Sequence, residues 1–431
     1  MDFAQAVHAS DALWGGGMRV LWFSNYRFRN TADSDTGTWI GSMGRYVKML
    51  PNVELCNITS GLVTEIIEEQ IDGVKQYVLP LWRCKDGLPN AENVAKIVSM
   101  VDSFHPDLVH FWGVENYYGL LVARGYIKYT ALLEMQGIKH AIAPFYGGGL
   151  SLGESLACTG VKECIRPHRH FLWQKRLFAN QKAAETETIR GFNHISYQSL
   201  WVRNHLNQIN PKANLHATGI MLRRAFMESE TWTVDNRGKT VVFASCGVSS
   251  PFKGLHVILR ALANLIHMGV ADSSLELHVA GDKGGVGIRK PGYTAWIERE
   301  IKRLGIGENV VFLGPQTAVQ MAAEMRNASV YVHASFCESY SLSVAEAMAL
   351  GMPCVVSYAG AMPELGTHGE NILYYQPGDH VSCAAMIRRV LEDCKLAVKL
   401  GENALMLGRK RNDIATVGTR QMKIYQEIVR D

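Results

Sequence analysis

Hydrophobic positions recur along the chain in two alternating patterns. Short runs rich in β-branched and aromatic residues predict buried strands, and longer stretches with apolar residues three or four positions apart predict helices. Strands that alternate with helices in this way favour an α/β fold with parallel sheets. The predicted strands are 18–24, 53–58, 74–79, 107–112, 129–135, 193–198, 240–246, 274–280, 309–313, 329–334 and 354–357.

The helical period is clearest over 254–268. Its apolar residues fall on one stripe and Gly269 ends it, the stripe being Leu255, Ile258, Leu259, Leu262 and Ile266. The predicted helix follows the strand 240–246 and a loop that contains Gly247 and Lys253. A lysine just before a helix, in a loop beyond a strand, is placed to reach a phosphate. A solvated surface lysine is the alternative interpretation.

A second strand, turn and helix are predicted over 329–357. Ser343 and Glu346 have the spacing of a capping box, which predicts a helix over 344–350 that Gly351 ends. The amide groups of about residues 341–343 would then lie at the positive end of this helix, where they can bind an anion.

Two carboxylates flank this turn, because Glu338 precedes it and Glu346 follows it. Carboxylates can accept hydrogen bonds from hydroxyls on either side of a diphosphate held by the amides. The stretch therefore suits a sugar nucleotide. Glu346 serving only as a helix cap is the alternative, but a capping box does not require Glu338.

Composition narrows the class of protein. The 431 residues suit two domains of roughly 200 residues each. Apolar residues make up 47% and charged residues 19%, which argues against global disorder. The net charge of +4 is too small to indicate a nucleic-acid partner. Nine scattered cysteines without a C-x-x-C pair predict neither a disulfide framework nor a zinc site, and they suit a reducing cytoplasm.

The order of the elements predicts two successive Rossmann-like domains facing across a cleft. Residues 1–17 are expected to be an extension and not a signal peptide, because they lack a basic start and a long apolar run. The first domain is predicted over 18–215, a polar linker over 216–238 and the second domain over 239–415.

Four motifs in the second half carry a family resemblance. They are S-P-F-K-G at 250–254, V-V-F-L-G at 310–314, E-S-Y-S-L-S-V-A-E at 338–346 and A-M-P-E at 361–364. In this order they resemble the retaining glycosyltransferases of family 4, of the bacterial polysaccharide or glycoconjugate type, which have the two-domain GT-B fold. The first half resembles the family more vaguely, through its opening strand, a glycine loop and P-D-L-V-H at 106–110. The resemblance also implies that a last helix, about 416–431, crosses back to the first domain.

The resemblance implies roles for the residues of the second domain. Glu346 would bind the ribose, Glu338 would lie against the donor sugar, and Lys253 would neutralise the diphosphate. Ser341, Leu342 and Ser343 would hold the distal phosphate through their backbone, and Phe312 and Leu313 would border the base. Gly247, in the loop before Lys253, would belong to the nucleotide-binding residues.

In the first domain, Gly37 would lie near the phosphate and His110 would be a catalytic candidate. A strand histidine bonded in the core is the alternative for His110. Three positions depart from the family pattern: Val248 replaces an arginine, Gly37-Thr38 replaces Gly-Gly, and Gln136-Gly137 replaces His-Gly. These departures put the diphosphate affinity and the first-domain catalytic group in question.

The implied reaction transfers a hexose from a UDP- or GDP-sugar to a hydroxyl, with retention at the anomeric carbon. No cofactor or divalent metal is expected, and Asp33 with Asp35 is interpreted as a surface loop. The acceptor is expected to be a saccharide or a lipid-linked saccharide. Basic and aromatic residues are mixed over 162–176, which fits peripheral contact with an anionic membrane, at the inner face of the cytoplasmic membrane. A solvated basic helix face is the alternative.

Other functions fit parts of the same pattern. A sugar-nucleotide epimerase or a phosphorylase shares the GT-B fold, and a non-catalytic adaptor that kept the fold would explain Val248. A dinucleotide oxidoreductase is the weakest alternative, because G-G-V-G at 284–287 lacks the G-x-G-x-x-G spacing.

Overall fold

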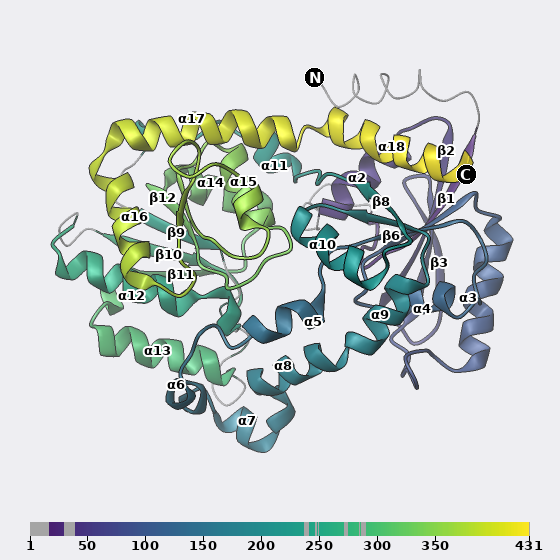
Figure 1. The fold of residues 1–431 in the computed structure, drawn as a ribbon, viewed down its shortest axis with the longest axis horizontal. Coiled ribbons are helices and arrows are strands. Elements are labelled where there is room, and N and C mark those ends of the chain that lie inside the picture. Colours follow the sequence, from purple (N-terminus) through teal and green to yellow (C-terminus); the bar gives the residue numbers. More distant parts are fainter. Residues whose placement is uncertain are drawn as a thin grey trace. The chain divides into compact units, whose positions relative to one another are not determined.

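The computed structural model describes residues 17–29, 39–236, 241–245, 248, 250–270, 275–283, 285 and 290–430. It forms two compact units (Figure 1). The first unit takes the described parts of Met1–Ile138, Lys182–Arg223 and Arg411–Asp431. The second takes those of Lys139–Gln181 and Arg224–Lys410. Both are α/β structures built on a parallel sheet, as the alternating pattern predicts.

The first unit contains an eight-stranded sheet in the order β3-β4-β2-β1-β5-β6-β7-β8. All neighbours are parallel except β3 and β4, which form an antiparallel hairpin. The strands are β1 Met18–Phe23, β2 Val53–Gly61, β3 Ile67–Ile71, β4 Val74–Pro80, β5 Leu108–Trp112, β6 Ala131–Glu134, β7 His194–Tyr197 and β8 Asn214–Ala217. The main helices are α2 Trp39–Lys48, α3 Ala91–Phe104, α4 Tyr118–Ala123, α9 Lys182–Arg190, α10 Leu200–Ile209 and α18 Ile414–Arg430.

The second unit contains a six-stranded sheet in the order β11-β10-β9-β12-β13-β14, parallel throughout. Its strands are β9 Val241–Ser245, β10 Glu276–Ala280, β11 Val310–Gly314, β12 Val330–His333, β13 Cys354–Ser357 and β14 Leu373–Tyr375. Its main helices are α12 Leu255–His267, α13 Gly292–Leu304, α14 Ala318–Asn327, α15 Leu342–Ala349, α16 His380–Glu392 and α17 Cys394–Arg411. The strand order reverses between β9 and β12, and such a switch point is where parallel sheets bind ligands.

Eleven predicted strands all have a counterpart, and β3, β8 and β14 were missed. Each missed strand lies at an edge of its sheet. An edge strand has one hydrogen-bonded neighbour and more contact with solvent, so polar residues such as those of Ile67–Ile71 weaken its hydrophobic signal. The amphipathic helix was predicted correctly, since α12 runs Leu255–His267 and buries the expected stripe apart from the partly exposed Ile266.

The segment Lys139–Gln181 belongs to the second unit, although it lies within the predicted first domain. This segment contains the short helices α5 Lys139–Ile142, α6 Leu152–Ala157 and α7 Val161–Ile165, followed by α8 Phe171–Asn180 (Figure 1). Side chains tie it to α12 and α13, because Glu154 pairs with Arg260 and Glu163 Oε1 accepts a 3.0 Å hydrogen bond from Gly292 N. The chain passes from the first unit to the second again between Arg223 and Arg224. Helix α11, Arg224–Met227, begins there, inside the predicted linker.

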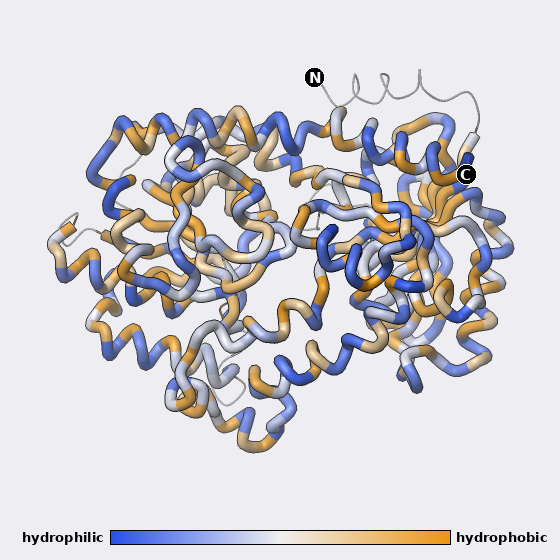
Figure 2. Tube along the Cα trace, viewed as in Figure 1, coloured by the Kyte–Doolittle hydropathy of each residue, from blue (hydrophilic) through white to orange (hydrophobic). Residues whose placement is uncertain are grey.

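Apolar residues concentrate inside each unit. In Figure 2 the strands of both sheets are mainly orange, whereas α17 alternates between orange and blue along its length. The last helix, α18, is amphipathic and buries Tyr425 completely in the core of the first unit. Among the described residues, no helix combines the length and the apolar character needed to cross a bilayer.

Candidate active site

The strongest candidate site lies where β9 and β12 end, at the switch point of the second sheet. The loop after β9 contains Lys253, and the loop after β12 contains Glu338. The two loops are joined by a 2.8 Å hydrogen bond from Phe336 N to Phe252 O. Gly254 has a φ of +74°, and a Cβ there would collide with the carbonyl of Ala334. Only glycine therefore lets the lysine loop lie this close to the neighbouring strand.

Lys253 and Glu338 form an ion pair across the switch point. Lys253 Nζ lies 2.6 Å from Glu338 Oε1, and His333 Nε2 lies 3.5 Å from the same oxygen. Burial alone would raise the pKa of Glu338, but the charge of Lys253 and the hydrogen bond from His333 outweigh it and lower the pKa to about 2. Glu338 is therefore a fixed negative charge, and its side chain is 12% exposed.

His333 was missed in the sequence analysis, although it lies in the predicted strand 329–334. It is the last residue of β12 and is nearly buried. Its Nε2 lies 3.3 Å from the hydroxyl oxygens of both Ser335 and Ser341. The signal available was its place at the carboxyl end of a strand, five residues before Glu338, where parallel sheets carry functional side chains.

Helix α15 begins at Leu342, two residues earlier than predicted. Its N-cap is Ser341, whose hydroxyl accepts from Val344 N at 3.4 Å, so the predicted capping box of Ser343 and Glu346 is wrong. Ser341 has the extended backbone that an N-cap residue requires, so the helix begins directly after it. The amides of Leu342 and Ser343 are then the first two of the helix, where no carbonyl four residues earlier belongs to it. This helix end is a favourable position for an anion.

The remaining residues predicted from the sequence lie in a helix, near a strand end or outside the described residues. Glu346 lies in α15 and is almost fully buried. Phe312 and Leu313 lie near the end of β11; Lys283 Nζ is 3.9 Å from the Phe312 ring centroid, and Gln316 donates to Leu313 O at 2.8 Å. Gly247 and, in the other unit, Gly37, Asp33 and Asp35 fall outside the described residues.

Val248 is fully buried, so its side chain offers no phosphate contact at the position where the resemblance leads us to expect an arginine. Among the described residues, no cluster of three or more His, Cys, Asp or Glu side chains has the arrangement of a metal site.

His110 lies in the first unit and belongs to its core. Its side chain is fully buried in β5, and Nδ1 forms a 2.7 Å hydrogen bond with the hydroxyl of Tyr425. Nε2 is 4.0 Å from Glu134 Oε2, and burial lowers the pKa of His110 well below its usual value, so the ring is neutral. A ring in this position has no direct access to a substrate, and the core alternative for His110 describes it better.

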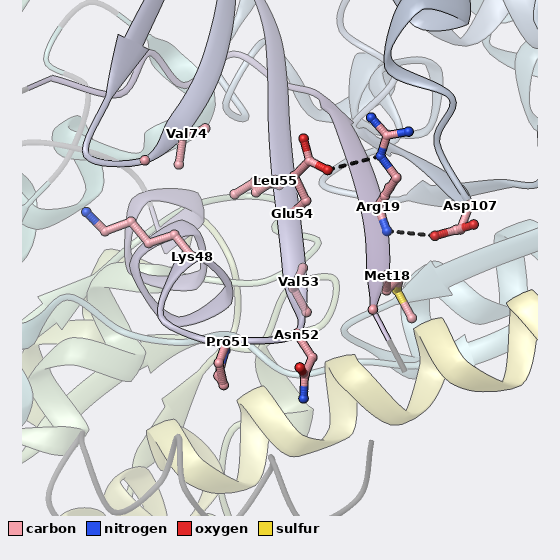
Figure 3. Close-up of a pocket in the computed structure, with 12 residues that line it drawn as sticks. Met18, Arg19, Lys48, Pro51, Asn52, Val53, Glu54, Leu55, Val74 and Asp107 are labelled. Carbon is pink, nitrogen blue, oxygen red and sulfur yellow. Dashed lines mark hydrogen bonds and ion pairs between the residues drawn. The ribbon is translucent and has the colours of Figure 1, made fainter. Parts of the chain in front are cut away.

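A surface hollow of the first unit lies at the amino ends of its strands (Figure 3). It is formed around the amino ends of β1 and β2. Arg19 binds both carboxylates: its side-chain Nε donates to Glu54 at 3.0 Å and its backbone N donates to Asp107 at 2.7 Å. Because ligands of parallel sheets bind at the carboxyl ends, this hollow is a weaker candidate than the switch point of the second unit.

Comparison with known families agrees with this choice. Residues 228–406, which include the whole Lys253 and Glu338 region, match the family described as glycosyl transferases group 1. The second unit is therefore similar to a group 1 glycosyltransferase domain.

Curated relatives extend the similarity over more of this chain. The D-inositol 3-phosphate glycosyltransferase of Corynebacterium kroppenstedtii is 23% identical over 84% of this chain and 74% of its own length. The MMP α-(1→4)-mannosyltransferase of Mycolicibacterium hassiacum is 32% identical over 45% of this chain and 44% of its own length.

Solved structures show that the fold is that of GT-B glycosyltransferases. A sucrose-phosphate synthase from Thermosynechococcus elongatus aligns with a TM-score of 0.69 and 14% identity, over 95% of this chain and 99% of that one. HepE of Anabaena, in complex with UDP and glucose, aligns with a TM-score of 0.65 and 17% identity, over 95% of this chain and all of that one.

Proposed function

We propose that this protein is a glycosyltransferase that moves a hexose from a nucleoside diphosphate donor to a hydroxyl acceptor with retention of configuration, in polysaccharide or glycolipid assembly. The observation that carries the proposal is the Lys253–Glu338 ion pair, which lies at a switch point beside the first amides of α15. A cation and unpaired helix amides favour an anion at the same sheet edge where parallel folds bind ligands.

The residues of the site would act mainly by electrostatics. Negative charge grows on the diphosphate as the bond to the sugar breaks, and Lys253 with the amides of Leu342 and Ser343 would stabilise it. Glu338, ionised and held by His333, would orient Lys253 and face the donor sugar. Glu346 would bind the ribose, and the backbone at Phe312 and Leu313 would border the base.

A UDP-sugar is the first donor to test, because the similar Anabaena protein was crystallised with UDP and glucose. Thermal unfolding is measured with UDP, GDP and ADP, since a ligand that binds only the folded protein raises its melting temperature. A nucleotide-specific rise, followed by acceptor-dependent release of that nucleotide from its sugar, is the expected result. Absence of binding to every nucleotide would favour the adaptor alternative, which the buried Val248 supports.

The proposal extends to a lipid-linked acceptor and peripheral contact at the cytoplasmic face of the inner membrane. In the segment 145–181 the only acidic residues, Glu154 and Glu163, are engaged with Arg260 and Gly292. Large apolar side chains are exposed beside the cations: Leu152, Leu156, Val161, Ile165, Leu172 and Trp173. The cations of 162–176 are Lys162, Arg166, Arg169, Lys175 and Arg176. A surface that combines exposed apolar and basic groups fits an anionic bilayer.

Vesicle co-sedimentation tests this part separately. We expect binding to vesicles with anionic lipid, weaker binding at high salt, and loss of binding when Arg166, Arg169 and Arg176 are changed to Gln. The matched control changes three exposed lysines of the same unit, Lys302, Lys395 and Lys410, to Gln. Equal loss in both variants would point to net charge alone, and no binding by the wild type would refute membrane contact without affecting the donor site.

A further inference from the structure

The segment Lys139–Gln181 reaches the lysine loop through three consecutive glycines, 147–149. The Tyr146 ring stacks on Phe252, with centroids 5.2 Å apart and planes 28° apart. Gly148 has a φ of +61°, and a Cβ there would collide with the carbonyl of Pro251. This part of the segment therefore lies directly against the turn that carries Lys253.

His256 joins the glycine loop to the start of α12. Its Nε2 lies 2.9 Å from Gly148 O, and its Nδ1 lies 2.9 Å from the hydroxyl of Tyr293. Since a carbonyl only accepts, Nε2 must carry the proton. Burial, with a smaller contribution from the charge of Arg260, lowers the pKa of His256 to about 4, so the ring is neutral and Nδ1 accepts from Tyr293. These two bonds fix the tautomer and the orientation of the ring.

The same ring also packs beneath the loop that leads to Glu338. Phe336 is parallel to His256, with centroids 6.0 Å apart and planes 11° apart. The backbone amide of Phe336 is the one that donates to Phe252 O at 2.8 Å. His256 thus contacts the glycine loop directly and supports, through Phe336, the two loops that carry the ion pair.

From this geometry we infer that His256 is a positioning residue: it holds the 147–149 loop against the Lys253 turn, so that the conformation of Lys139–Gln181 sets the position of Lys253. His256 is 3% exposed and does not touch the reacting atoms. Its effect on transfer rests on the proposed function. The coupling is reciprocal: whatever binds the exposed part of Lys139–Gln181 also acts on the loop proposed to bind the donor, and donor binding acts back on the segment.

Two substitutions at His256 separate positioning from packing. The amide of His256→Gln lies near the place of Nε2 and keeps the donor to Gly148, whereas the shorter side chain of His256→Asn lies near Nδ1 and loses it. We expect His256→Asn to lower kcat/KM about 10- to 100-fold, because small displacements of catalytic groups are costly. His256→Gln should restore most of this loss. Tyr293→Phe keeps the Gly148 bond and is the matched control.

Hydrogen exchange of the unliganded protein supplies a readout that does not depend on activity. In His256→Asn, amides of residues 147–149 and 250–254 should exchange faster than in the wild type, and in His256→Gln they should not. If His256→Asn does not fold, Gly148→Ala, which pushes the glycine loop away from Pro251, should give the same faster exchange at 250–254.

Unchanged exchange in a folded variant, or equal effects of Gln and Asn, would overturn the positioning role. If the wild type transfers no sugar from any donor, the proposed function fails instead, and the exchange experiment still decides whether His256 couples the loops.

Discussion

Each unit places a histidine of a strand near a glutamate at its switch region, but the two glutamates behave in opposite ways. In the second unit Glu338 contacts Lys253, and its pKa falls to about 2. In the first unit Glu134 is fully buried without a cation, and burial raises its pKa to about 8 although Ser196 and Gln198 donate to it. A partner charge at contact distance therefore matters more than burial in deciding which carboxyl stays ionised.

The two glutamates are also expected to differ in what they affect, activity in the second unit and stability in the first. Glu338 is charged, and its side chain keeps 12% of its surface exposed. Glu134, His110 and Tyr425 form a buried neutral cluster, in which Tyr425 OH also accepts from Trp22 Nε1 at 3.2 Å. This cluster fastens α18 to the sheet of the first unit. Changes in it should affect stability first, and changes at the ion pair should affect activity first.

The largest expected effect is on activity at the ion pair. Lys253→Ala should lower kcat by about 100- to 1000-fold, because a positioned group that stabilises developing charge contributes that much in other enzymes. Nucleotide release assays measure the loss, with exposed Lys302→Ala on α13 as the control. If Lys253→Ala retains wild-type kcat, the site must lie elsewhere.

A pH-dependent effect on stability is expected next, in the first unit. The pKa of Glu134 is about 8 in the folded protein against a usual 4.5. Its contribution to the free energy of unfolding is therefore complete below about pH 4.5 and is lost as the pH rises through about 8. Glu134→Gln cannot ionise and should remove roughly 2–4 kcal/mol of this pH dependence between pH 5 and pH 9. Urea unfolding at both pH values measures it, and equal pH slopes in variant and wild type would contradict the burial of an uncharged carboxyl.

Tyr425→Phe should destabilise the first unit by about 1–3 kcal/mol, because Trp22 Nε1 and His110 Nδ1 would lose a buried partner. Thermal unfolding measures the loss. The kcat of the folded variant at a permissive temperature should change much less than in Lys253→Ala. If kcat of the folded variant falls as far as in Lys253→Ala, the cluster has a catalytic role.

The smallest expected effect concerns the start of α15. Ser341→Ala removes the N-cap and should cost about 1 kcal/mol of stability, whereas Ser343→Ala should cost little, because Ser343 is not the cap. The two variants are compared by urea unfolding. The reverse order would restore the capping box predicted from the sequence.

The sequence predicted the sheets well because their central strands are continuous apolar runs, and the three missed strands are polar or short edge strands. Lys253 and Glu338 were predicted as neighbours in function because each follows a strand and precedes a helix. Their direct contact depends on Gly254 and on a loop-to-loop hydrogen bond, neither of which has a periodic signal. His110 occupies a position with family precedent, but its burial depends on Tyr425, more than 300 residues later.

The helix start was predicted two residues late, since both Ser341 and Ser343 are good caps and their backbone angles decide between them. The sequence pattern also could not predict that Lys139–Gln181 belongs to the second unit. This assignment depends on single long-range contacts, such as that of Glu163 with Gly292.

The chain passes from one unit to the other between residues 138 and 139, 181 and 182, 223 and 224, and 410 and 411. The first unit lacks Tyr425 until the last segment of the second unit has been synthesised, so its assembly cannot be finished before that of the second unit begins. Neither unit is a continuous stretch, and a fragment starting at residue 224 would leave His256 and Arg260 without their partners in Lys139–Gln181. The two units should accordingly complete their folding together, and dissection by truncation should yield insoluble pieces.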